Sequence, residues 1–221
     1  MEENMMEFGQ MLLDGNKENH KILFLSIIGE IEGHHLSSEN IKTTKYEHLL
    51  PILARAQDDK NIEGIILLIN SVGGDCSCGL ALAEMIASMT KPVVSLIIGD
   101  SHSIGFPLSV AADYTFIAPT ATVILHPVRL TGTIIGAPQT FDYFRLMQDR
   151  IINFLTEHTK ASKNVLEEMM LHQGIMTKDL GTILLGEEAV KKGLVDETGG
   201  IGDALEWLHR EIGNRKKQLF K

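Results

Sequence analysis

Short apolar runs alternate with helix-like segments through the middle of the chain. The runs at 65–70, 93–99 and 122–125 contain no charged residue, and each leads into small or polar residues. Apolar runs of this kind, alternating with helices, are typical of parallel strands that are buried on both faces of a sheet. The pattern therefore predicts an α/β fold built on a parallel sheet.

The same pattern predicts the elements on either side of these runs. In chain order they are a strand at 20–31, helices at 44–58, 80–89 and 104–112, a short strand at 113–119, a long amphipathic helix at 139–159, and then a helix at 162–172, a brief apolar segment at 182–185 and helices at 187–192 and 201–212. Residues 1–19 are expected to be a loosely ordered arm. Residues 20–221 are expected to form one domain, with a handle region at about 128–180.

The ends of the three apolar runs carry the candidate chemistry. A Gly73-Gly74 turn follows the first run, Ser103 follows the second, and His126 follows the third. The carboxyl ends of parallel strands are where α/β sheets bind ligands. Acyl transfer needs a nucleophile, a base, a group that orients the base, and donors for an oxyanion. Residue types alone do not assign this function, because serines and glycines are common at strand ends.

Composition narrows the function classes. The chain has 44% hydrophobic and 22% charged residues, which is typical of a globular protein, and its net charge of −9 argues against a nucleic-acid partner. No apolar run is long enough to span a membrane, and the acidic N-terminus does not resemble a secretory signal, so a cytoplasmic location is expected. Cys76 and Cys78 lack metal-ligand spacing, and no metal or cofactor is expected.

Four segments together resemble the ClpP serine protease family. They are Ile-Asn-Ser-Val-Gly-Gly at 69–74, Gly-Asp-Ser-His-Ser-Ile-Gly at 99–105, Ile-Leu-His-Pro at 124–127, and Gly-Glu-Glu-Ala-Val-Lys-Lys-Gly-Leu-Val-Asp at 186–196. The resemblance covers residues from about 20 to 198. It implies a ClpP/crotonase-like superhelix of repeated β-β-α units with a long helical handle. It also implies a homo-oligomeric ring that cleaves peptides or unfolded protein segments in an internal chamber.

The resemblance also implies roles for individual residues. Ser103 corresponds to the nucleophile and His126 to the general base, while the N–H groups of Gly73 and Ile104 correspond to the oxyanion hole. Gly74, with Val128 in the segment after the histidine, is expected to bind substrate.

Several positions depart from the family pattern. The residue aligned with the triad acid is Gly181, so we predict that Asp179, two residues earlier, orients the base. Ser101-His102 replace Ala-Ala before the nucleophile, which makes Ser101 a rival nucleophile. The loops at 32–43 and 171–180 are more similar to the translocation-enhancing branch of ClpP-related proteins than to the ATPase-coupled subunit.

Two other functions remain open at this point. A crotonase-type acyl-CoA enzyme would use a similar oxyanion hole for a thioester enolate, although the serine and histidine pair argues against it. A catalytically inactive ClpP-like scaffold is the other, and the missing aligned acid favours it. Ile66 and Leu68 replace the aromatic residues on the family's ATPase-docking surface, which leaves an unfoldase partner undecided.

Overall fold

The computed structural model of the chain describes residues 9–14, 20–34, 37–38, 40–129, 135–173 and 180–219. The strands are β1 (Gln10–Asp14), β2 (Lys21–Glu32), β3 (Thr43–Lys45), β4 (Gly64–Gly74), β5 (Val93–His102), β6 (Tyr114–Ile117), β7 (Thr122–Leu125), β8 (Thr182–Leu185) and β9 (Glu197–Thr198). The helices are α1 (Tyr46–Asp58), α2 (Cys76–Ala87), α3 (Gly105–Val110), α4 (Ala137–His158), α5 (Lys163–Leu171), α6 (Gly186–Lys191) and α7 (Ile201–Leu219).

The strands form one mainly parallel sheet with the order β1-β2-β4-β5-β6-β9. Strand β3 pairs with β2, and β7 pairs with β5 and β8. The β1–β2 and β7–β8 pairs are antiparallel, whereas every other pair is parallel. The predicted α/β class with a parallel sheet is therefore confirmed.

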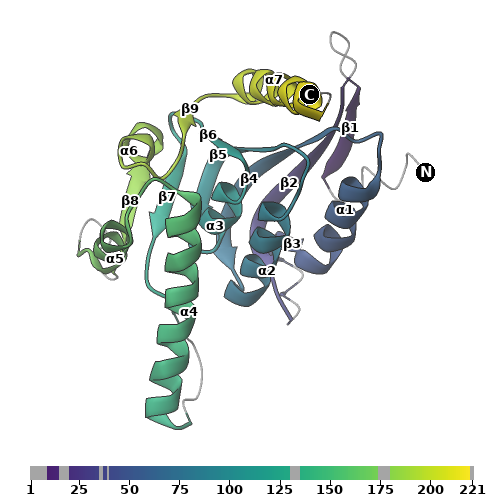
Figure 1. Ribbon diagram of the computed structural model, residues 1–221. Coiled ribbons are helices and arrows are strands. Elements are labelled where there is room, and N and C mark those ends of the chain that lie inside the picture. Colours follow the sequence, from purple (N-terminus) through teal and green to yellow (C-terminus); the bar gives the residue numbers. More distant parts are fainter. Residues whose placement is uncertain are drawn as a thin grey trace.

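Helices cover both faces of the sheet, as the apolar strand runs require. On one face α7 packs against β4 and β5, and its Ala204, Leu208 and Ile212 are buried with sheet residues such as Val94 and Leu96. On the other face α1, α2 and α3 cover the sheet (Figure 1). Strands β2, β4, β5 and β6 therefore contribute apolar side chains to two separate layers.

Strand β5 changes partner along its length. Residues 94–97 pair with β6, and residues 100–102 pair with β7 instead. The change coincides with an irregularity in the pairing with β4, between Ile69 and Ser71. Irregular pairing of this kind bends a strand and re-aims its end. As a result the end of β5, which leads to Ser103, lies beside β7, which leads to His126.

Helix α4 has two distinct halves. Ile151, Phe154 and Leu155 in its C-terminal half are buried in the core. Its N-terminal half projects from the body (Figure 1), and there Phe141 is 68% and Leu146 is 57% exposed. None of the helices in the described part of the chain is long and apolar enough to span a membrane.

The structure differs from the sequence-based expectations at β3 and β9, which were not predicted, and at α7, which continues to Leu219. Two further differences concern the first strand and the glycine pair. Within the segment expected to be a loose arm, residues 10–14 form β1, because their backbone groups pair with β2; residues 1–8 and 15–19 lie outside the described residues. The Gly73-Gly74 segment is the end of β4 and not a turn, because its backbone pairs with Glu30 and Ile31 of β2. The two adjacent glycines made the segment look like a turn in the sequence, and in the structure both have the positive φ that glycine permits.

Candidate active site

Ser103 lies where β5 ends and α3 begins. Its φ of 54° is left-handed, and no other non-glycine residue in the described part of the chain has a positive φ. Its N–H donates to the Ile124 carbonyl at 2.9 Å, which ties this turn to β7. A left-handed serine costs about 1–2 kcal/mol, and a strained turn between strand and helix is how many hydrolases expose a nucleophile.

Ser101, the rival nucleophile, lies two residues earlier and is completely buried. Its Oγ is 2.8 Å from the Ser109 Oγ in α3. The Ser109 hydroxyl donates to the Gly105 carbonyl at 3.0 Å, so the Ser101 hydroxyl is the donor between the two serines. Ser103, and not Ser101, lines the cavity at this edge of the sheet. The surroundings of Ser101 are those of a structural hydroxyl.

Gly73 lies directly against Ser103. A Cβ at Gly73 would be 2.7 Å from the Ser103 Cβ and 2.8 Å from the His102 carbonyl oxygen, both too close for a side chain. The φ of Gly73 is +94°, which also favours glycine. The backbone of β4 can therefore approach the serine more closely than any other residue type would permit.

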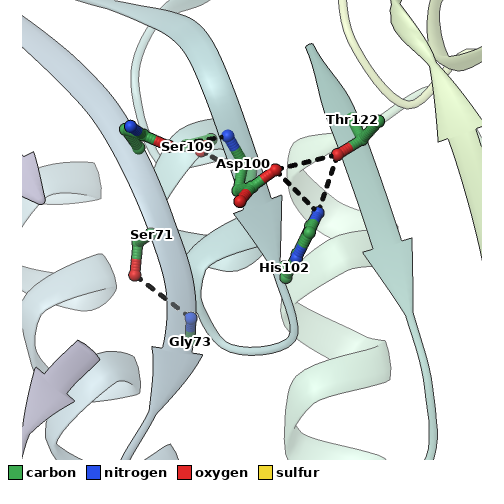
Figure 2. A network of polar contacts seen from close by, with 8 residues as sticks. Ser71, Gly73, Asp100, His102, Ser109 and Thr122 are labelled. Carbon is green, nitrogen blue, oxygen red and sulfur yellow. Dashed lines mark hydrogen bonds and ion pairs between the residues drawn. The ribbon is translucent and has the colours of Figure 1, made fainter. Parts of the chain in front are cut away.

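The Gly73 N–H, expected to bind an oxyanion, is already hydrogen-bonded. It donates to the Ser71 Oγ at 3.1 Å (Figure 2), and the Ser71 hydroxyl donates to the Gly29 carbonyl at 2.7 Å. Oxyanion binding through Gly73 therefore requires this hydrogen bond to open. This competition could not be predicted from the sequence, because it depends on the contact between β4 and β2.

His126 follows β7 and is held by its own chain. Its Nδ1 lies 2.7 Å from the Pro127 carbonyl oxygen. Because a carbonyl only accepts hydrogen bonds, this contact places the proton on Nδ1 and leaves Nε2 as the acceptor in the neutral ring. That tautomer is the one a general base requires.

The predicted orienting acid, Asp179, lies outside the described residues. At the aligned position, Gly181 has a φ of +138°, and a Cβ there would be 2.6 Å from the Leu125 carbonyl oxygen and 2.9 Å from the His126 Cβ. The backbone at 181 therefore packs against the histidine, and there is no space for an acidic side chain pointing from this position.

A cavity of about 140 Å³ joins these groups. Ser103, Ile104 and His126 line it, and so do Gly74 and Val128, the two residues expected to bind substrate. The rest of the lining is mainly apolar and comes from Cys76, Leu125, Ile151, Leu155 and Met170, with Arg129 as a charged member. The ends of three strands and the buried half of α4 thus meet around one small, largely apolar space.

A polar cluster beside the nucleophile did not emerge from the motifs. The Thr122 hydroxyl donates to Asp100 Oδ1 at 3.1 Å, and His102 Nε2 lies 2.8 Å from the Thr122 Oγ and 3.3 Å from Asp100 Oδ1 (Figure 2). Burial lowers the pKa of His102; Asp100 opposes this shift and nearby His126 adds to it. The alternation of Asp100 and His102 on one face of β5 was the available signal.

No metal-binding arrangement is found where the structure is described: no group of three or more His, Cys, Asp or Glu side chains there could hold an ion. Cys76 is partly buried, and burial raises the pKa of the Cys78 thiol to about 11. Burial also raises the pKa of the Cys76 thiol, so both thiols are protonated at neutral pH.

Comparison with known proteins gives consistent matches. The Clp protease family model matches residues 27–200. The chain is 48% identical over 206 residues to the translocation-enhancing protein TepA of Halalkalibacterium halodurans, covering 93% of this chain and 80% of that protein. It is 29% identical over 138 residues to the ATP-dependent Clp protease proteolytic subunit 1 of Chlamydia abortus, covering 60% of this chain and 68% of that subunit.

Proposed function

The chain belongs to the Clp protease family, and on that premise we propose that it is a serine peptidase with Ser103 as nucleophile and His126 as general base. The observation that carries the proposal is that both side chains line one small cavity, with the serine held in a strained left-handed turn. Strain of this kind is retained where the surrounding structure fixes it, commonly at catalytic positions.

In the proposed reaction the Ser103 Oγ attacks a peptide carbonyl carbon. His126 Nε2 accepts the serine proton and then donates it to the leaving amine, so that an acyl-enzyme forms and water later hydrolyses it. The oxyanion is bound by the N–H of Ile104, and by that of Gly73 once its hydrogen bond to Ser71 opens. Each missing donor of this kind typically costs about 10²–10³ in turnover.

The third member of the proposed triad is Asp179, which would hold the Nδ1 side of His126. The Pro127 carbonyl already contacts that nitrogen at 2.7 Å. A carbonyl fixes the tautomer as a carboxylate does, but without the charge that stabilises the imidazolium formed during the reaction. We therefore propose that Pro127 and Asp179 together fix the tautomer of His126, and that Asp179 supplies the charge that stabilises the imidazolium.

The substrates we propose are peptides or unfolded protein segments. The mainly apolar cavity lining, from Leu125, Val128, Ile151, Leu155 and Met170, fits an apolar side chain next to the cleaved bond. The cytoplasmic location stays a prediction. An ATPase partner stays open, and Ile66 is fully buried in the layer under α7, where no partner could contact it.

We further propose that the protein is a ring-shaped homo-oligomer assembled through α4. Exposed apolar residues gather on the projecting half of this helix, including Phe141, Tyr143 and Leu146. Several exposed apolar side chains gathered on a helix that projects from the body are typical of an interface. Sedimentation at micromolar concentration should show an oligomer, and a stable monomer of 24.4 kDa would exclude the chamber.

A fluorophosphonate probe tests the catalytic proposal directly. The wild-type protein should be labelled, and peptide mapping should place the adduct on Ser103. Ser103→Ala should abolish labelling, whereas Ser101→Ala should retain it. Labelling that persists in Ser103→Ala and disappears in Ser101→Ala would show that the nucleophile is wrongly assigned. Coenzyme A binding without labelling would favour the crotonase-type alternative.

An inactive scaffold is the second candidate, and two observations favour it. The Gly73 N–H is hydrogen-bonded to Ser71, and the aligned acid position is a glycine with no space for a side chain. A wild-type protein that forms the oligomer but is never labelled by the probe would support the scaffold over the peptidase.

A further inference from the structure

Three strands carry the working groups of the proposed site, and one chain of hydrogen bonds crosses all three. The Asn70 Oδ1 on β4 accepts from the Asp100 N–H on β5 at 2.9 Å. Asp100 Oδ1 accepts from the Thr122 hydroxyl on β7 at 3.1 Å. His102 on β5 closes the chain through its contacts with Asp100 and Thr122 (Figure 2). We propose that this chain is a clamp that positions Ser103 and His126 relative to each other.

The direction of the hydrogen bonds follows from their chemistry. A threonine hydroxyl has one proton, and here it goes to the Asp100 carboxylate, which only accepts. The Thr122 oxygen must therefore accept from His102, so His102 carries a proton on Nε2. The His102 ring thus acts as a donor toward both partners. Because the carboxylate and the hydroxyl contact the same nitrogen, the cluster is not a second catalytic triad.

The clamp lies where the pairing of the sheet is short and irregular. Strand β7 pairs with β5 over residues 122–124 only, directly after β5 leaves β6. The irregular pairing with β4 spans residues 98–100, and the Asn70 side chain supplies the acceptor for the Asp100 N–H there. Short, irregular pairing is a poor way to fix register. Side-chain hydrogen bonds across the strands are directional, so they can fix the register that this short backbone pairing does not.

The clamp is adjacent to both reacting groups. His102 immediately precedes Ser103, and Thr122 begins the strand that ends just before His126. Asn70 immediately precedes the segment that brings Gly73 against Ser103. A movement of β7 relative to β5 therefore displaces the base from the nucleophile, and misplacement by about 1 Å can cost about 10²-fold in rate.

The clamp rests on the proposed function. It can be tested by the saturation kinetics of fluorophosphonate labelling at Ser103. Thr122→Val removes the hydroxyl at constant shape, and His102→Ala removes the ring. Each should lower kinact about tenfold and leave KI within about twofold, because the geometry of attack changes and the cavity does not. The double variant should lose little more than either single variant, since both break one cluster.

Conservative variants separate positioning from simple loss of stability. Thr122→Ser and His102→Gln each keep a hydrogen-bonding group at the clamp and should recover most of kinact. Asp100→Asn keeps an acceptor oxygen and removes the charge, so its kinact should be close to that of Thr122→Ser and His102→Gln. The kinact of Asp100→Ala should be as low as that of Thr122→Val. The matched control is Thr90→Val, which deletes a hydroxyl bonded to Gln57 far from the site.

The outcomes are distinct. Labelling of wild type with unchanged kinact in Thr122→Val and His102→Ala would overturn the clamp and leave the peptidase intact. An equal loss in Asp100→Asn and Asp100→Ala would overturn positioning by hydrogen bonds in favour of a charge effect. If Thr122→Val does not unfold cooperatively, the kinact values of His102→Ala and His102→Gln test the clamp instead. No labelling of wild type at Ser103 would overturn the proposed function, and the clamp with it.

Discussion

The two ends of β5 are held in place by different forces. In its first half, Val94 and Leu96 pack under α7, while Val93 and Ile97 pack toward α2 and α3. In its last three residues, hydrogen bonds from Asp100 and His102 replace this apolar packing. Apolar burial is strong but has no direction, whereas hydrogen bonds weaken steeply with angle. The first half of β5 therefore contributes stability, and the second half contributes the geometry that the proposed catalysis requires.

The largest effect should come from Asp179, the proposed acid that orients His126. Asp179→Asn should lower turnover about 10⁴-fold, because it removes the charge that stabilises the protonated His126. The melting temperature should change little. Peptide cleavage and thermal unfolding measure the two quantities, and Asp58→Asn, on an exposed residue at the end of α1, is the matched control. Near-normal turnover would leave a Ser–His dyad oriented by the Pro127 carbonyl alone.

Weakening the apolar packing of the first half of β5 should lower stability and leave the labelling rate unchanged. Ile97→Ala should lower the free energy of unfolding by about 2–5 kcal/mol, because the side chain is completely buried. The rate of Ser103 labelling per folded molecule should stay at the wild-type value. Urea unfolding gives the stability, and Ile98→Ala is the control, since Ile98 is 42% exposed. A labelling rate that fell with stability would show that the two ends are not separable.

Ser101 lies between Asp100 and His102 in the polar end of β5 and is completely buried, so it sharpens the comparison. Ser101→Ala should cost about 1 kcal/mol of stability, the usual net value of one buried hydrogen bond. The loss is small because the Ser109 hydroxyl keeps the Gly105 carbonyl as its acceptor. Urea unfolding measures this cost. A loss above about 3 kcal/mol would mean that Ser101 contributes packing as well as the hydrogen bond.

The smallest effect concerns pH. Because burial lowers the pKa of folded His102, the unfolded state binds more protons once the pH falls below about 6.5, the ordinary value for histidine. Acidification through this range therefore favours unfolding. His102→Gln removes this contribution, so its melting temperature should fall less between pH 7 and pH 5 than that of wild type. Parallel curves for the two proteins would show that His102 titrates normally.

The apolar half of this comparison could be predicted from the sequence. The runs that form β4, β5 and β7 are continuous and bounded by small residues, so their existence, parallel pairing and burial followed from pattern alone. The long helix was also predicted, although only its C-terminal half is core. Composition and periodicity are sufficient here because apolar burial depends on residue type more than on position.

The polar half could not be predicted in the same way. Polar residues at strand ends have several possible partners, and the choice of Thr122 for Asp100 and His102 depends on the register of β7 against β5. The hydrogen bond from Gly73 to Ser71 depends likewise on the course of β4 beside β2. Strand β1 was missed because its segment lacks a long apolar run and is fixed by pairing. Ser103 and His126 were reachable through motifs, and their assignment as catalytic residues stays a prediction.

The glycine at position 181 sets a limit for protein engineering. An acid introduced at the aligned position would clash with the backbone, since a Cβ there would lie 2.6 Å from the Leu125 carbonyl oxygen. Gly181→Asp would force the Leu125 and His126 backbone apart before its carboxylate could act. A stronger base can therefore be built only by placing the acid at a neighbouring position or by rebuilding the whole loop, which makes Gly181 a constraint on redesign and not a vacancy to be filled.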